Sequence, residues 1–259
     1  MKNKELKKFY DNVYKKGREK HFSTFVLSAA TSHEKEVLTM ISWKAKNVLD
    51  VGCGTGFFTY CVAKKGGNVL GVDYSPNAIN CAKLNYSHEN LNYKNTDVKK
   101  IKEKFDIIVS HGTLEHMDNP LGMLKFFKRH LNPKGQIIIT APNWTNPRGY
   151  ILLTLYYLFN APITLADFHY FTPIDFQKFA KKLKMKLKWK TIDRAWSQGD
   201  VMIKDLEKRL PKILHDSKLP HGKKNIEFFV RWIKTNIVTL NNDLPHSGAT
   251  GVYIFSLKR

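Results

Sequence analysis

The stretch VLDVGCGTG, residues 48–56, decides the fold of this chain. A short apolar run that ends in a glycine cluster is typical of a buried parallel strand turning directly into a helix. Glycines in such a turn let the backbone approach a ligand, and the N–H groups at the helix start attract an anion. We therefore expect a ligand-binding loop at residues 50–56.

Acidic residues around this loop separate two classes of ligand. Gly52 and Gly54 fit the first half of the dinucleotide pattern G-x-G-x-x-G, but Phe57 stands where the third glycine is required. Asp50 precedes the first glycine by two residues, and Asp73 ends the next predicted strand. A carboxylate at the end of that strand accepts hydrogen bonds from ribose hydroxyls. The pattern therefore indicates a nucleoside-containing ligand other than a nicotinamide dinucleotide.

Outward from the loop, apolar strands alternate with helical patterns. This rhythm predicts right-handed β-α-β units and a parallel sheet that is covered on both faces. After residue 142 the rhythm gives way to an apolar stretch, a helix, a lysine-striped strand and further helices. The expected strands are 46–51, 68–73, 91–95, 105–110, 136–142, 182–190 and 251–258; the expected helices are 57–65, one capped by Ser75, 119–131, 172–183 after Thr172, and pieces of 197–245 divided at Pro211 and Pro220; NPKG at 132–135 is expected to be a turn.

Five segments in order resemble class I S-adenosylmethionine-dependent methyltransferases. They are VLDVGCGTG, GVDYS (71–75), NTDV (95–98), FDIIVSHGTLEHM (105–117) and LNPKG (131–135). The resemblance covers roughly residues 44–195. It implies an α/β fold with a doubly wound, mostly parallel seven-stranded sheet of order 3-2-1-4-5-7-6, whose last strand is antiparallel, with helical lid insertions.

The resemblance also assigns binding roles, with S-adenosylmethionine as the cofactor. The glycine loop would surround the methionine moiety, with Asp50 supporting the loop or the amino group. Asp73 would bind the ribose, and Asp97 the adenine amino group. The full set implied to bind the cofactor is Asp50, Gly52, Cys53, Gly54, Gly56, Asp73, Tyr74, Asp97, Val98 and Ser110.

Three histidines are candidates for catalysis: His111, His116 and His169. A base is needed only where the acceptor must lose a proton, as a hydroxyl must. The segment around His116 resembles the E-x-x-E-H segment of ubiquinone-biosynthesis O-methyltransferases, but Gly112 replaces the first glutamate. That replacement argues against a metal site, and no metal is expected. Packing and helix capping remain the alternative roles for His116 and His169.

An uncharged segment between Arg148 and Asp167 raises the question of whether the chain is a soluble or a membrane protein. Asn160 and Pro162 interrupt it, so a lid or buried helix is the main expectation; an interfacial or membrane-spanning helix is the alternative. Its aromatic residues pack or contact the substrate: Tyr150, Tyr156, Tyr157 and Phe159. One domain with six parts is expected: an N-terminal helical cap (1–43) holding Tyr10 and Tyr14, the donor-binding core (44–142), an apolar lid (143–171), the sixth helix and strand (172–195), a helical insertion (196–249) and a closing strand (250–259).

The charge of +21 is carried by 36 lysines and only 7 arginines. Readers of bases and phosphates favour arginine, so nucleic acid is not the expected partner. The lysines in KLKMKLKWK (182–190) would lie on an edge strand, where they discourage pairing with another sheet. Three cysteines and an N-terminus without an apolar core favour the cytoplasm, with peripheral contact to an anionic membrane surface as an option.

These observations predict a methyltransferase that acts on a small or lipid-like acceptor, with oxygen as the expected atom. A glycan or saccharide precursor is an alternative acceptor, and RNA is a weaker one. A partner protein that binds the donor without catalysis is the alternative outside enzymes. The sequence leaves the oligomeric state open.

Overall fold

The computed structural model describes residues 31–164, 167–240 and 244–258. The described residues divide into two compact units. The first holds residues 31–141, 177–188 and 252–258, and the second holds 142–164, 167–176, 189–240 and 244–251. Each unit is a folded body with its own core. Tyr10 and Tyr14 lie outside the described residues.

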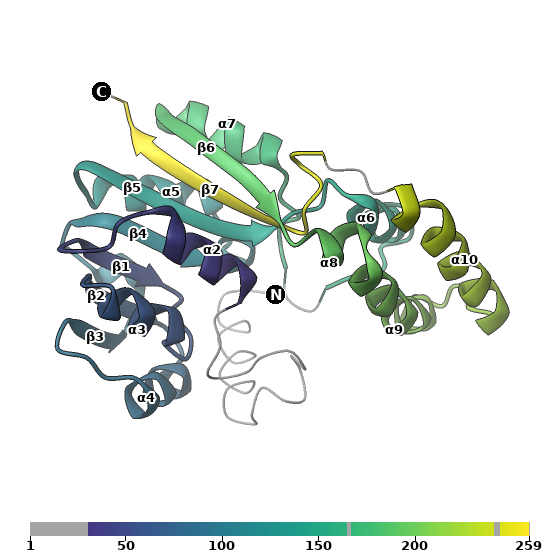
Figure 1. The fold of residues 1–259 in the computed structure, drawn as a ribbon, viewed down its shortest axis with the longest axis horizontal. Helices are drawn as coiled ribbons and strands as arrows, with labels where there is room; N and C mark the ends of the chain where they lie inside the picture. Colours follow the sequence, from purple (N-terminus) through teal and green to yellow (C-terminus); the bar gives the residue numbers. More distant parts are fainter. Residues whose placement is uncertain (1–30, 165–166, 241–243, 259) are drawn as a thin grey trace. The chain divides into compact units, whose positions relative to one another are not determined.

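A seven-stranded sheet forms the frame of the first unit. Its strand order, β3-β2-β1-β4-β5-β7-β6, confirms the expected topology, and β7 runs against its neighbours (Figure 1). The strands are β1 (Asn47–Val51), β2 (Asn68–Asp73), β3 (Leu91–Asn95), β4 (Phe105–His111), β5 (Leu131–Pro142), β6 (Met185–Ile192) and β7 (Thr250–Leu257).

The register of the central strands brings three strand ends together. Asp50 on β1 pairs with Gly71 on β2 and with Val109 on β4. The residues that follow each of these therefore leave the sheet at the same edge, where ligands of open parallel sheets bind. Buried Val48, Leu49 and Ile108 fill the sheet below this edge.

Helices cover both faces of this sheet, and their caps follow from the sequence. Figure 1 shows α2 and α3 in front of the strands and α5 behind them. Ser75 accepts the N–H of Ala78 at the start of α4, as expected for an N-cap residue followed by proline. The helices and 3₁₀ turns of the first unit are α2 (Ser32–Met40), α3 (Phe57–Lys64), α4 (Pro76–Asn85), η2 (Val98–Lys100), η3 (Leu114–His116) and α5 (Pro120–Arg129).

Two expectations about the bounds of strands are wrong. The NPKG segment was expected to be a turn before β5 but lies within that strand. Phe105 of β4 pairs with Leu131 of β5 and Ile107 pairs with Gln136, so the residues between Leu131 and Gln136 form an irregularity in which Lys134 has φ +67°. The lysine stripe is divided, because α7 (Pro173–Leu183) continues through Leu183. Burial within β6 alternates only from Met185 onward.

The second unit is helical. A core of Leu206, Leu210 and Ile213 keeps α9 continuous through Pro211, which was expected to end a helix. Packing of three buried side chains therefore outweighs the missing N–H at the proline. The other proline-marked division, near Pro220, is present. The helices of this unit are α6 (Pro147–Phe159), α8 (Arg194–Gln198), α9 (Asp200–Asp216), α10 (Lys223–Asn236) and the 3₁₀ turn η4 (Val238–Leu240).

Helix α6 holds the apolar segment and leaves much of it uncovered. Tyr156 packs against Tyr170 with ring centroids 4.7 Å apart, as a packing role requires. Tyr150, Tyr157 and Phe159 are instead 56%, 68% and 50% exposed. No helix in the described residues has the length and apolar character needed to cross a membrane.

Candidate active site

The loop after β1 is held in a left-handed shape. Gly52, Gly54 and Gly56 have φ values of +74°, +55° and +83°, a region that L-residues with a side chain rarely adopt. A Cβ on Gly56 would overlap the hydroxyl of Tyr93, and a Cβ on Gly52 would lie 2.7 Å from Thr113 Oγ1. The loop therefore needs glycine both for its backbone shape and for the close approach of its neighbours.

Asp73 fixes this loop from the end of β2. Its Oδ2 accepts the N–H of Gly54 at 3.1 Å, and its Oδ1 accepts the N–H of Ser75 at 2.8 Å. A carboxylate has about four lone-pair sites, so one group can hold the loop and also meet a ligand hydroxyl. Only 9% of Asp73 is exposed, so its carboxylate is largely shielded from water.

Asp50 lies beneath the loop in the sheet. Thr59 of α3 donates a hydrogen bond of 2.7 Å to its Oδ2, and only 2% of the residue is exposed. Burial raises the pKa of Asp50 to about 7; the Thr59 bond lowers it, and the charges of Glu34 and Asp73 raise it further. The carboxyl group therefore titrates near neutral pH and responds to any cation placed beside it.

The end of β4 supplies two buried polar atoms. Among the described residues, neither Ser110 Oγ nor His111 Nε2 has a hydrogen-bond partner. His111 Nδ1 lies 3.1 Å from Thr140 Oγ1, and the edge of the ring meets Phe58 at a centroid distance of 4.3 Å. Burial holds the pKa of His111 well below its usual range, and nearby His33 lowers it further. The imidazole is therefore neutral at physiological pH.

Helix α2 contributes a residue that the sequence analysis missed. His33 lies with its ring centroid 5.5 Å from that of His111, although 78 positions separate them. Thr31 and Glu34 form a capping box that starts the helix. That T-x-x-E pattern could have predicted the helix start, but nothing local links His33 to β4. Tyr93, whose hydroxyl donates to Gly56 O at 2.9 Å, was missed as well.

The other predicted site residues lie at different places, some beside the glycine loop and one in the other unit. Asp97 is exposed and caps η2 by accepting the N–H of Lys99 at 2.9 Å, while Val98 is buried behind it. His116 lies in η3, five residues beyond His111. His169 belongs to the second unit, where it stacks on Phe171 at 5.3 Å. Cys53 and Tyr74 are half-buried beside the loop and Asp73.

The residues of this site fit S-adenosylmethionine. Thr113 packs against Gly52 and Tyr93 against Gly56, so protein side chains fix the backbone of the loop from these sides. Asp73 stands at the end of β2, where a carboxylate can accept a ribose hydroxyl, and Asp50 and Ser110 Oγ, which has no hydrogen-bond partner among the described residues, offer oxygen atoms for the cationic methionine end. The side-chain atoms named here are oxygen atoms that can accept hydrogen bonds. Such atoms suit a cation that carries a sugar better than a free phosphate.

Comparisons with known proteins agree with this geometry. Residues 42–192 match the family model described as a methyltransferase domain. The chain is 30% identical over 156 residues to the ubiquinone biosynthesis O-methyltransferase of Dechloromonas aromatica, covering 56% of this chain and 67% of that protein. It is 35% identical over 133 residues to the protein of the same name from Coxiella burnetii, covering 49% and 56%. The matches thus span between about half and two thirds of the curated relatives' length.

A solved structure shares the fold over nearly the whole chain. It is a SAM-dependent methyltransferase from Thermotoga maritima, superposed with a TM-score of 0.60 at 14% identity, covering 96% of this chain and 98% of that one. At this identity the likeness concerns the fold alone. The family match covers more than half of the chain and includes every residue of the glycine loop. The chain therefore belongs to the methyltransferase domain family, whose members use S-adenosylmethionine as the methyl donor.

Proposed function

We propose that this S-adenosylmethionine-dependent methyltransferase methylates a hydroxyl oxygen of a small acceptor that carries an apolar group. The observation that supports oxygen as the target is His111, a neutral, half-buried imidazole at the end of β4 whose Nε2 has no hydrogen-bond partner among the described residues. A hydroxyl acceptor must lose a proton, and a neutral imidazole can accept it. The relatives from Dechloromonas and Coxiella carry names that specify O-methylation in ubiquinone biosynthesis.

His111 is held for this task by its neighbours. In the tautomer whose Nδ1–H donates to Thr140 Oγ1, Nε2 keeps its lone pair and can accept a proton. The pairing of Asp50 with Val109 supports this role, because Gly52 and His111 each follow that pair by two residues at the same edge of the sheet. Phe58 and His33 pack on the ring and limit its rotation and its contact with water.

Charge balance supports the same role. When bound, the donor supplies a methyl group on a positively charged sulfur, and that charge disappears on transfer. A proton accepted by His111 restores one positive charge to the site, so that the net charge is unchanged in a region where burial penalises charge. Positioning and exclusion of water then supply much of the remaining rate.

Exposed apolar side chains in the second unit support the proposal that the acceptor carries an apolar group. Exposed Tyr157, Leu158 and Phe159 at the end of α6 form an apolar surface of the kind that contacts ligands, partners or membranes. We propose that this surface makes peripheral contact with a lipid phase, from which a lipid-like acceptor is taken. Lysines, which dominate the charge of the chain, favour an anionic surface.

The test is methyl transfer from labelled S-adenosylmethionine to a catechol that bears an alkyl chain. Incorporation into the catechol oxygen is expected, and none into the matched compound whose two ring oxygens are already methylated. Transfer to a saccharide acceptor instead, or label found only on carbon or nitrogen, contradicts the proposal. Binding of the donor without transfer to any acceptor class would favour a non-catalytic partner protein.

A further inference from the structure

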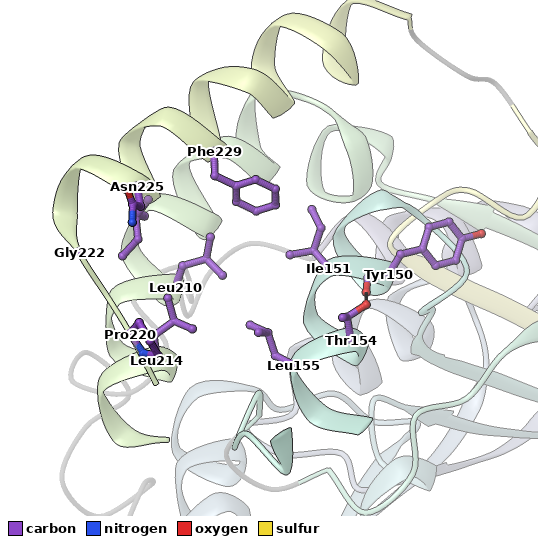
Figure 2. Close-up of a pocket in the computed structure, with 11 residues that line it drawn as sticks. Tyr150, Ile151, Thr154, Leu155, Leu210, Leu214, Pro220, Gly222, Asn225 and Phe229 are labelled. Carbon is purple, nitrogen blue, oxygen red and sulfur yellow. Dashed lines mark hydrogen bonds between the residues drawn. The ribbon is translucent and has the colours of Figure 1, made fainter. Parts of the chain in front are cut away.

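A cavity of about 470 Å³ lies within the second unit, between α6, α9 and α10. Figure 2 shows Ile151 and Leu155 of α6 on one side, Leu210 of α9 on another, and the ring of Phe229 of α10 pointing into the space between them. All residues that line the cavity belong to the second unit, whereas the glycine loop at residues 50–56 belongs to the first. Its size falls in the range of small-molecule sites.

The lining restricts the chemistry of a ligand. Leucine, isoleucine and phenylalanine side chains make up most of the wall. Of the polar lining residues, Thr154 already donates its hydroxyl to Tyr150 O at 2.7 Å within α6. The side chains of Tyr150 and Asn225 are the other polar groups of the wall, so a sugar or nucleotide placed here would leave most of its hydroxyls without partners, which is costly. A hydrocarbon chain loses no hydrogen bonds on entering such a cavity and gains from leaving water.

Lysines lie close in the sequence to one wall of the cavity. Pro220 and Gly222 form part of its wall, and exposed lysines stand next to them in the chain: Lys218, Lys223 and Lys224. Two acids belong to the same region: Asp216, which contacts His215, and Glu227, whose Oε1 lies 3.9 Å from Lys223 Nζ. Lysines thus outnumber acids here, so that a ligand with an anionic end is favoured over a neutral or cationic one.

Exposed aromatic residues flank the same helices. Phe228 and Trp232 of α10 are 70% and 49% exposed, and Arg231 lies between them in the chain. Large aromatic side chains together with basic ones are typical of helices that meet amphiphilic molecules. The apolar wall, the lysines near it in the sequence and the exposed aromatic residues of α10 therefore indicate one kind of ligand.

We infer that the cavity between α6, α9 and α10 binds the hydrocarbon chain of an anionic single-chain amphiphile of the fatty-acid class, with its charged end among Lys218, Lys223 and Lys224. This inference does not depend on the proposed methylation, because it concerns binding in the absence of any methyl donor. It assigns to the helical insertion a ligand site of its own.

The test is calorimetric titration of the full chain with monomeric dodecanoate. Thr154→Trp places a bulky ring on the cavity wall, and Thr235→Trp makes the same change at an exposed position of α10 that does not line the cavity. Excluding two methylene groups corresponds to about fifteenfold in affinity, so Thr154→Trp is expected to weaken binding at least about tenfold. Thr235→Trp is expected to stay within about twofold of the wild type.

Two further measurements need no cavity variant. In a chain-length series on the wild type, affinity should rise about fourfold per methylene and level off once the cavity is filled. A double Lys223→Glu, Lys224→Glu variant should bind dodecanoate roughly threefold more weakly while its affinity for dodecanol is unchanged.

Three results would overturn the inference. One is equal affinity in the wild type and a folded Thr154→Trp variant. Another is binding only to anionic vesicles, without sensitivity to chain length or to Thr154→Trp. The third is a dimer that Thr154→Trp dissociates and that binds no dodecanoate, because the cavity wall would then be an interface between two copies. A failure of methyl transfer to every acceptor would leave these binding results untouched.

Discussion

The ionisation of Asp50 should control the stability of the fold near neutral pH. The residue is 2% exposed, and burial raises its pKa from 3.8 to about 7. In the unfolded chain the carboxyl loses its proton near pH 4, whereas in the folded chain it keeps it up to about pH 7. Because the folded-state pKa is raised, the contribution of this group is fully present below pH 4 and is lost as the pH rises toward 7.

The magnitude follows from the size of the shift. A difference of about three pKa units corresponds to about 4 kcal/mol of the free energy of unfolding, at about 1.4 kcal/mol per pH unit. Asp50→Asn removes the titration and keeps an oxygen that can accept the hydroxyl of Thr59. Relative to the wild type, the variant should gain about 4 kcal/mol between pH 4 and pH 8.

Urea unfolding followed by circular dichroism at several pH values measures this difference directly. The wild type and Asp50→Asn share all other titrating groups, so that subtracting one curve from the other isolates Asp50. Parallel pH profiles for the two proteins would refute the reasoning, since they would mean that Asp50 ionises equally in both states. If the cationic amino group of the donor lies beside Asp50, binding near pH 6 should also release a proton, visible in calorimetry as a dependence on buffer ionisation enthalpy.

Three other substitutions test the packing and the chemistry. Gly56→Ala should destabilise the fold by about 1–3 kcal/mol more than Gly66→Ala, because both glycines have φ near +84° but only Gly56 lacks room for a Cβ; equal losses in chemical unfolding would show that the crowding is relieved. Asp205 of α9 lies 2.9 Å from the guanidinium of Arg148 and 3.0 Å from that of Arg209. Asp205→Ala should therefore cost on the order of 3 kcal/mol, and more than Arg148→Ala, because it leaves both guanidinium groups without their shared carboxylate; thermal unfolding that ranks the two variants in reverse order would contradict this. His111→Gln should lower methyl transfer to a hydroxyl about a hundredfold while donor affinity changes little; unchanged turnover would remove His111 as the base.

Much of the first unit could be predicted from the sequence because its signals are local. The apolar runs at Val48–Val51 and Ile107–Val109, the glycines between strand and helix, and the cap at Ser75 each act within a few residues. The spacing of these elements then fixes a parallel order. The family resemblance added the position of the last strand, which no local pattern in Thr250–Leu257 reveals.

Features that depend on distant contacts could not be predicted. Pro211 stays inside α9 because side chains from the rest of the second unit cover the helix around it. His33 reaches His111 only through the docking of α2. The use of Asp73 to hold Gly54 is a third example, because the identity of an acidic residue does not say which donor it binds.

The central claim is that the glycine loop and Asp73 bind S-adenosylmethionine, the loop at its methionine part and Asp73 at its ribose, and calorimetric titration with S-adenosylhomocysteine tests it most directly. The wild type should bind, and Asp73→Ala should bind at least roughly tenfold more weakly, the loss of about one charge-assisted hydrogen bond. Unfolding of the variant must be checked, since Asp73 also accepts the N–H of Gly54. A wild-type protein that binds no S-adenosylhomocysteine, or a folded Asp73→Ala variant that binds it equally well, would contradict the account.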